Sequence, residues 1–159
     1  MRKTYRLILG ALTTATILVC GANAQNTDKA KDDAIKKDRK LYEGTWRIVS
    51  LEVDGNKAAD EDAKKIVVVK KVDGSWSIQV DGKEVAKGTS TIDPTKKPKT
   101  IDLTITEGDD AGKAALGIYE LDKDSRKVCI ARPGKDRPTE FTSKAGSSHI
   151  LATFKREKP

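Results

Sequence analysis

Runs of alternating apolar and polar residues, separated by Asp-Gly pairs, are the dominant pattern of this chain. The alternation is clearest over residues 75–80 and 101–106, where the apolar positions are Trp76, Ile78, Val80, Ile101, Leu103 and Ile105. A period of two residues is typical of strands that bury one face. The Asp-Gly pairs at 54–55, 73–74 and 81–82 supply the positive φ angles of tight hairpin turns. The pattern therefore predicts an antiparallel β-meander.

Nine segments of this kind follow one another at short, regular intervals after residue 41. Their predicted ranges are 43–53, 66–72, 75–81, 84–92, 99–106, 114–121, 126–132, 137–142 and 148–156. No strong helices alternate with them, which disfavours a parallel sheet. The predicted fold is all-β, an antiparallel up-and-down barrel of about eight strands.

The first of these segments changes phase in its middle. Trp46 and Ile48 share one phase of the alternation, whereas Leu51 and Val53 share the other. Burying all four side chains requires a bulge or bend near residues 49–50, which lets one long strand turn a barrel corner. Just before the second segment, the composition of the chain predicts one or two helical turns.

The first 24 residues have the three regions of a secretory signal peptide. Three cations without an acid precede a short apolar run, and the small residues Ala22-Asn23-Ala24 follow it. We expect cleavage after Ala24 and export to the periplasm or the medium. Cys20 offers the alternative of a lipoprotein anchor, although a bulky residue precedes it. The rest divides into a charged leader, residues 25–40, and a globular domain, residues 41–159. The leader is either disordered or a short exposed helix, and we expect a helix only in its last turns.

Charge is spread over the mature chain rather than gathered on one face. The formal net charge of +7 falls to +4 when the three cations of the signal peptide are removed. Paired lysines are interleaved with paired acids, and the chain has only two Trp, three Tyr and two Phe for stacking. Nucleic acid is therefore not an expected partner. After cleavage no second apolar segment predicts a transmembrane span, and we expect a monomer.

Residues that carry chemistry are scarce. His149 is the only histidine, and its serine neighbours lie too close along the chain to converge on it as a catalytic triad does. Cys129 stands alone once the signal peptide is removed, and its apolar neighbours favour a buried thiol. The acidic turns at 107–110 and 122–124 lack the spacing of a calcium-binding loop. We therefore predict a protein that is not an enzyme and has no metal or cofactor.

Residues Gly44-Thr45-Trp46, in the first predicted strand, resemble the Gly-x-Trp signature of the lipocalins. That family places a basic side chain over the tryptophan ring, and Lys155 or Arg156 in the last strand would fill this role over Trp46. A longer resemblance, to the lipocalin-like domain of exported planctomycete proteins, is carried by residues 51–55, 93–103, 117–121 and 132–141. The resemblance implies a barrel and export, and no established activity.

The remaining candidate site is the interior of the predicted barrel. Its expected lining is Trp46, Ile48, Trp76, Ile78, Ile101, Leu103 and Ile118. A small domain without a disulfide needs such side chains for stability, at about 1.5 to 3 kcal/mol each, so we expect a filled or nearly filled core.

Two functional hypotheses follow from the predicted barrel. If an open mouth leads to an internal space, the domain binds a small apolar molecule. If the core is solid, the outer face or the proline-rich loops around Lys96 and Lys135 bind another protein or the cell envelope.

Overall fold

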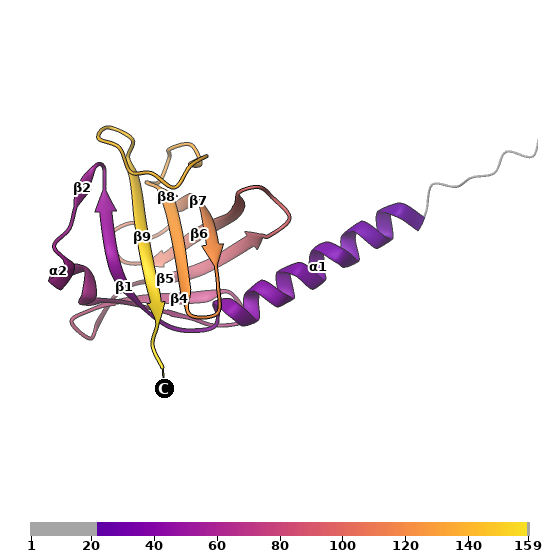
Figure 1. The fold of residues 1–159 in the computed structure, drawn as a ribbon, viewed down its shortest axis with the longest axis horizontal. Coiled ribbons are helices and arrows are strands. Elements are labelled where there is room, and N and C mark those ends of the chain that lie inside the picture. Colours follow the sequence, from indigo (N-terminus) through magenta and orange to yellow (C-terminus); the bar gives the residue numbers. More distant parts are fainter. Residues whose placement is uncertain (1–21, 159) are drawn as a thin grey trace, which may run out of the picture.

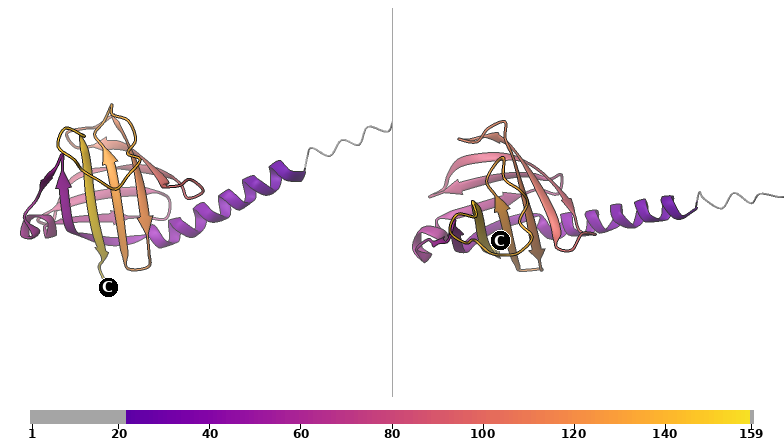
Figure 2. Two further views of the ribbon diagram at one scale, coloured as in Figure 1. Left: turned by 45° about the horizontal axis from the view of Figure 1, so that its top comes forward. Right: turned by 90° about the horizontal axis from the view of Figure 1, so that it is seen from above.

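Eight antiparallel strands close into a barrel, which confirms the predicted fold class. The computed structural model describes residues 22–158. Its strands are β1 (Gly44–Val53), β2 (Asn56–Lys57), β3 (Ile66–Lys70), β4 (Ser75–Val80), β5 (Lys83–Asp93), β6 (Lys99–Glu107), β7 (Ala114–Leu121), β8 (Ser125–Ala131) and β9 (His149–Arg156). The chain runs up and down around the wall, and β9 pairs with β1 to close it (Figures 1 and 2). The short β2 is an extra strand at the end of β1.

Two of the Asp-Gly pairs form two-residue hairpin turns. The pairs at 54–55 and 81–82 have positive φ at both residues, 51° and 83° in the first and 51° and 76° in the second. This conformation matches the twist of the flanking strands. In the third pair only Gly74 has a positive φ, of 94°, while the Asp73 carboxylate accepts hydrogen bonds from Ser75. The turns therefore lie where the sequence predicts them.

The predicted irregularities around β1 are also present. The register between β1 and β9 shifts between Ile48 and Ser50, which confirms the bulge. The short helix α2 (Asp60–Lys64) lies just before β3, where helical turns were predicted, and it buries Ala63 in the core.

One predicted strand is absent, because residues 137–142 belong to the long connection from β8 to β9. This connection packs against the wall of the barrel instead of extending it. Arg137 donates hydrogen bonds to the carbonyl oxygens of Ile101 and Gly117, and it forms an ion pair with Asp102 at 2.6 Å. The segment therefore covers the sheet from outside without joining it.

Helix α1 (Ala22–Tyr42) is longer than predicted, since it spans 21 residues rather than only the last turns of the leader. Opposite charges four residues apart, such as Asp32 and Lys36 or Asp33 and Lys37, stabilise an exposed helix. The C-terminal turns of α1 pack against β5 and β7. The helix thus crosses the boundary predicted at residue 40 and ends in the core of the barrel.

The barrel has a closed end and a mouth. Helix α1 meets it where β1 begins and β9 ends, and the last residue of the helix, Tyr42, lies in the core there. From this end α1 projects to one side (Figure 1). The connections between β4 and β5, β6 and β7, and β8 and β9 lie at the opposite end, which is the mouth.

The predicted signal peptide and the alternative anchor at Cys20 lie outside the described residues, apart from Ala22-Asn23-Ala24 in the first turn of α1. Within residues 22–158, none of the helices combines the length and the apolar character that a membrane span requires.

Candidate functional site

The interior of the barrel holds a cavity of about 420 Å³. At the mouth its wall includes the exposed residues Val85, Asp109 and Arg132, so it opens to solvent there. Inward side chains from all eight barrel strands make most of the wall apolar, among them Ile48, Val68, Ile78, Leu103, Val128 and Phe154. The volume lies in the range of small-molecule sites.

Five of the seven residues predicted to line the interior face this cavity. They are Ile48, Trp76, Ile78, Ile101 and Leu103. Trp46 is fully buried, but it belongs to the packed core at the closed end and is not part of the cavity wall.

Ile118 was wrongly assigned to the interior. The inward side chains of β7 include Ala115 and Tyr119, so Ile118 points to the outer face of the sheet. It is nevertheless only 1 % exposed. Its β8 partner, Cys129, donates a hydrogen bond from its thiol to the Thr142 carbonyl oxygen of the β8–β9 connection. This connection adds an apolar layer that strand alternation alone does not reveal.

The cavity also corrects the expectation of a filled core. Small side chains occupy several inward positions of the wall, namely Ala86, Ala115 and Ala152. The width of a barrel is set by the number and tilt of its strands. Small residues at these positions therefore leave space at the centre.

Trp46 and Arg156 close the barrel below the cavity. The indole Nε1 of Trp46 donates a hydrogen bond to the Tyr42 carbonyl oxygen at 2.9 Å. The guanidinium carbon of Arg156 lies 4.2 Å from the centroid of the Trp46 ring, and the same group donates to the carbonyl oxygen of Leu41. Of the two basic residues predicted for this position, Arg156 occupies it, and Lys155 is exposed. The contact joins the end of β9 to the end of α1.

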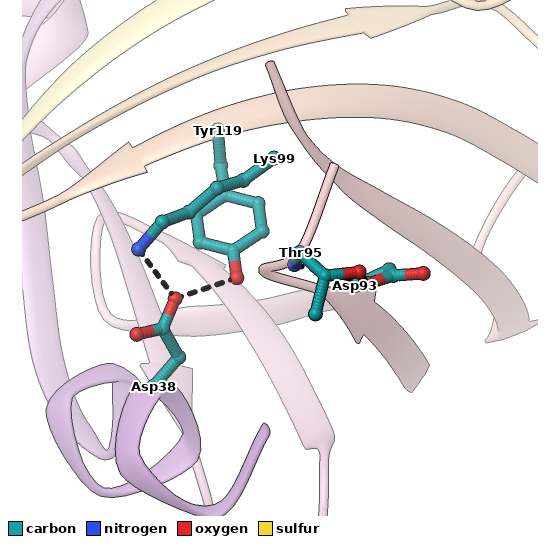
Figure 3. Close-up of polar contacts among 5 residues, drawn as sticks. All are labelled: Asp38, Asp93, Thr95, Lys99 and Tyr119. Atoms are coloured by element: carbon teal, nitrogen blue, oxygen red, sulfur yellow. Dashed lines mark hydrogen bonds and ion pairs between the residues drawn. The ribbon is translucent and has the colours of Figure 1, made fainter. Parts of the chain in front are cut away.

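Asp38 attaches α1 to β6 and β7 (Figure 3). It is 5 % exposed, and its carboxylate accepts hydrogen bonds from the Lys99 ammonium at 2.8 Å and the Tyr119 hydroxyl at 2.7 Å. Burial and the bond to Asp38 raise the pKa of Tyr119 above its ordinary value, so this hydroxyl stays protonated and donates. The Tyr119 ring packs edge-on against Tyr42, with centroids 5.2 Å apart.

Lys70 of β3 lies on the floor of the cavity. It is 6 % exposed, and its ammonium nitrogen lies 5.4 Å from the ring centroid of Tyr42 and 5.7 Å from that of Trp76. No hydrogen bond or ion pair joins this nitrogen to any residue of the described chain. Burial and the positive charges of Arg126 and Arg39 hold the pKa of Lys70 well below its ordinary value of 10.5.

Arg126 of β8 lines the same floor. It is 3 % exposed, and its guanidinium carbon lies 3.9 Å from the ring centroid of Phe154 and 5.1 Å from that of Trp46. Burial lowers the pKa of Arg126 to about 10, which leaves it positive at neutral pH. Within residues 22–158, neither its Nε nor the buried hydroxyl of Tyr42 has a hydrogen-bond partner. Burial raises the pKa of Tyr42 to about 12.

Sequence reasoning missed Lys70, Arg126 and Tyr42. The phase of the strands carried the information for the two cations, because Lys70 is in phase with the inward Val68 and Arg126 with the inward Val128. A charge on the buried face of a strand is rare. A charged residue at such a position indicates that the interior of the barrel is not only an apolar core.

The other reactive side chains form backbone contacts. Ser143 donates to the carbonyl oxygen of His149, and Ser147 accepts from its N–H, while in the described structure the His149 ring has no serine partner. Cys129 is fully buried, and burial raises the pKa of its thiol. Within residues 22–158, no group of three or more His, Cys, Asp or Glu side chains is placed to hold a metal ion.

Comparison with known proteins assigns no family to the chain. No protein-family model matches it, and neither a curated protein nor a solved structure matches it. The resemblance to the lipocalins rests on the residues named above.

Proposed function

We propose that this chain is an exported, non-enzymatic binding module of lipocalin-like type that takes a small apolar molecule into its barrel. The observation that carries the proposal is the cavity of about 420 Å³, with a largely apolar wall and an opening at the mouth. Side chains around an empty space lack contacts on one side. An apolar ligand of matching size would supply these contacts and leave water for a favourable environment.

The cavity favours this hypothesis over the solid-core alternative. A domain that acts only through its outer face or loops requires no internal space, and it gains stability from a filled interior. Here the inward alanines of β5, β7 and β9 leave the space open, next to large side chains that form a continuous wall.

A neutral fluorescent probe tests the proposal. N-phenyl-1-naphthylamine should bind saturably, with an increase in fluorescence, because the cavity shields it from water. Ala115 lines the cavity and is 5 % exposed, so Ala115→Phe would place a ring in the space that the probe needs. We expect this variant to weaken binding about tenfold or more, which corresponds to about 1.4 kcal/mol.

Ala114→Phe is the matched control, because Ala114 precedes Ala115 in β7 and is exposed. Its affinity for the probe should equal that of the unmodified protein. The proposal is wrong if the unmodified protein does not bind the probe, or if a folded Ala115→Phe variant binds it as tightly as the control.

A further inference from the structure

The floor of the cavity differs chemically from its wall. Three polar side chains line the space there, namely Lys70, Arg126 and Tyr42. Both cations lie against the ring of Tyr42, each 5.4 Å from its centroid. Toward the mouth the wall is formed mainly by aliphatic side chains, such as Leu51, Ile66 and Ile150.

No acid among residues 22–158 forms an ion pair with either cation. The buried carboxylate at this end of the barrel belongs to Asp38, which is already bonded to Lys99 and Tyr119. Contacts with aromatic rings stabilise a buried cation by about 2 kcal/mol. Removing a charge from water costs several kcal/mol for each ion. The rings therefore offset only part of the cost of keeping two cations here.

Building on the proposed binding function, we infer that the molecule held in the barrel is an amphiphilic anion. Its anionic head group would lie on the floor, between Lys70, Arg126 and the Tyr42 hydroxyl, and its apolar part would extend along the wall toward the mouth.

The donors on the floor suit a carboxylate, sulfonate or phosphate group. Within residues 22–158, neither the Nε of Arg126 nor the hydroxyl of the neighbouring Tyr42 has a hydrogen-bond partner that satisfies it, and Arg126 forms no ion pair. Hydrogen bonds from charged donors to an anion are stronger than those between neutral groups. A bound anion would also favour the protonated form of Lys70, because an opposite charge stabilises an ammonium. The head group would thus neutralise the positive floor.

Competition among three amphiphiles with the same twelve-carbon chain tests this inference. N-phenyl-1-naphthylamine is first bound to the protein and then displaced with dodecanoate, dodecan-1-ol or dodecyltrimethylammonium. The two ionic amphiphiles are kept below their micellar concentrations, and the alcohol is kept below its solubility limit. We expect dodecanoate to displace the probe at a concentration about tenfold lower than dodecan-1-ol, because charged hydrogen bonds add about 1.5 kcal/mol or more. The cationic amphiphile should be the weakest competitor.

Lys70→Met and Arg126→Met should each reduce the preference for dodecanoate, measured within each variant as the ratio of the displacing concentrations of dodecan-1-ol and dodecanoate. Lys71→Met is the matched control, since it removes the same charge from the exposed neighbour of Lys70 and should keep the full preference. Lys70→Met decides the test if Arg126→Met does not fold.

The outcomes separate this inference from the proposed function. The inference of an anionic head group is wrong if dodecanoate and dodecan-1-ol compete equally, or if a folded Lys70→Met variant keeps the full preference for dodecanoate. In either case the proposal of an apolar ligand is retained. If the probe does not bind at all, both proposals are wrong.

Discussion

Lys70 occupies a position where a lysine destabilises the folded protein. Its side chain is 6 % exposed, and the positive Arg126 and Arg39 are near enough to disfavour a charge on it. An unpaired charge in an apolar interior is among the most unfavourable arrangements in a protein. The residue therefore lowers stability, which is consistent with a role in binding rather than in folding.

We predict that Lys70→Met is more stable than the unmodified protein by about 1 kcal/mol or more at pH 7, because it replaces a buried ionisable group with an apolar side chain of similar length. The folded pKa of Lys70 lies below the unfolded value of 10.5, so the unfolded chain binds more protons between these two values. The stability of the unmodified protein therefore rises with pH in this window. Urea unfolding of both proteins at pH 7 and pH 9.5 should show the difference narrowing as pH rises.

Lys71→Met provides the comparison, because an exposed lysine is expected to change stability by less than about 0.5 kcal/mol. A Lys70→Met variant less stable than the unmodified protein at pH 7 would mean that the lysine supports the fold.

For single residues of the barrel interior, the sequence predicts the large apolar positions well and misses the polar positions. Strand alternation placed Ile48, Ile78 and Leu103 on the inward face, where the structure has them. The same alternation places Lys70 and Arg126 inward, but a lysine or arginine in a strand is usually solvated. Only the closed wall and the lack of an ion pair with any acid of residues 22–158 distinguish these two from surface cations.

Among the elements, α1 is joined to the barrel mainly by its last turns. Besides Asp38, Arg39 donates hydrogen bonds to Ser90 of β5, and Lys31 forms an ion pair with Asp93 at 2.9 Å. These contacts hold the helix at the closed end. The buried pair of Asp38 and Tyr119 should be the most important of them, because neither group can turn to water.

We predict that Asp38→Ala destabilises the protein by about 1 to 3 kcal/mol, the cost of leaving the buried Tyr119 hydroxyl without an acceptor. The free energy of unfolding in urea measures the effect. Asp33→Ala is the control, since Asp33 is exposed on the same helix. Adding Tyr119→Phe to Asp38→Ala should cause little further loss, because the hydroxyl that lacks an acceptor is then removed. Equal stability of the two alanine variants would contradict this role for Asp38.

The two errors at the element scale have physical causes outside the local pattern. The leader is mostly polar, with Ile35 its only large apolar residue. Its helix gains from tertiary contacts of Asp38, Arg39 and Tyr42 that no local pattern contains. Residues 137–142 pack against the outside of the barrel instead of joining the sheet, and the same packing explains the burial of Ile118 on that face. A single covering connection thus accounts for both misassignments in this region.

For the whole molecule, the regular spacing of strands and turns was sufficient to predict a closed antiparallel barrel. It was not sufficient to predict the cavity. Whether an interior is filled depends on the sum of the inward side-chain volumes against the width of the barrel, and this width follows from the strand tilt. Trp76 and Leu103 were both predicted as inward residues, and both line the cavity, but the sequence does not say how far each reaches toward the centre.

Export also concerns the chain as a whole, and it stays a prediction. We expect that the full chain, expressed in a bacterium with a secretion pathway, is recovered outside the cytoplasm with Gln25 as its first residue. Mass spectrometry of the intact protein and of its N-terminal peptide measures this. A lipid-modified N-terminus at Cys20 would establish the anchored alternative, and an uncleaved cytoplasmic chain would show that export is wrong.

Because α1 leaves the barrel from its closed end, it does not obstruct the entrance to the cavity. At 1.5 Å per residue, its 21 residues extend about 30 Å. A molecule could therefore enter or leave the cavity without passing the helix (Figure 1).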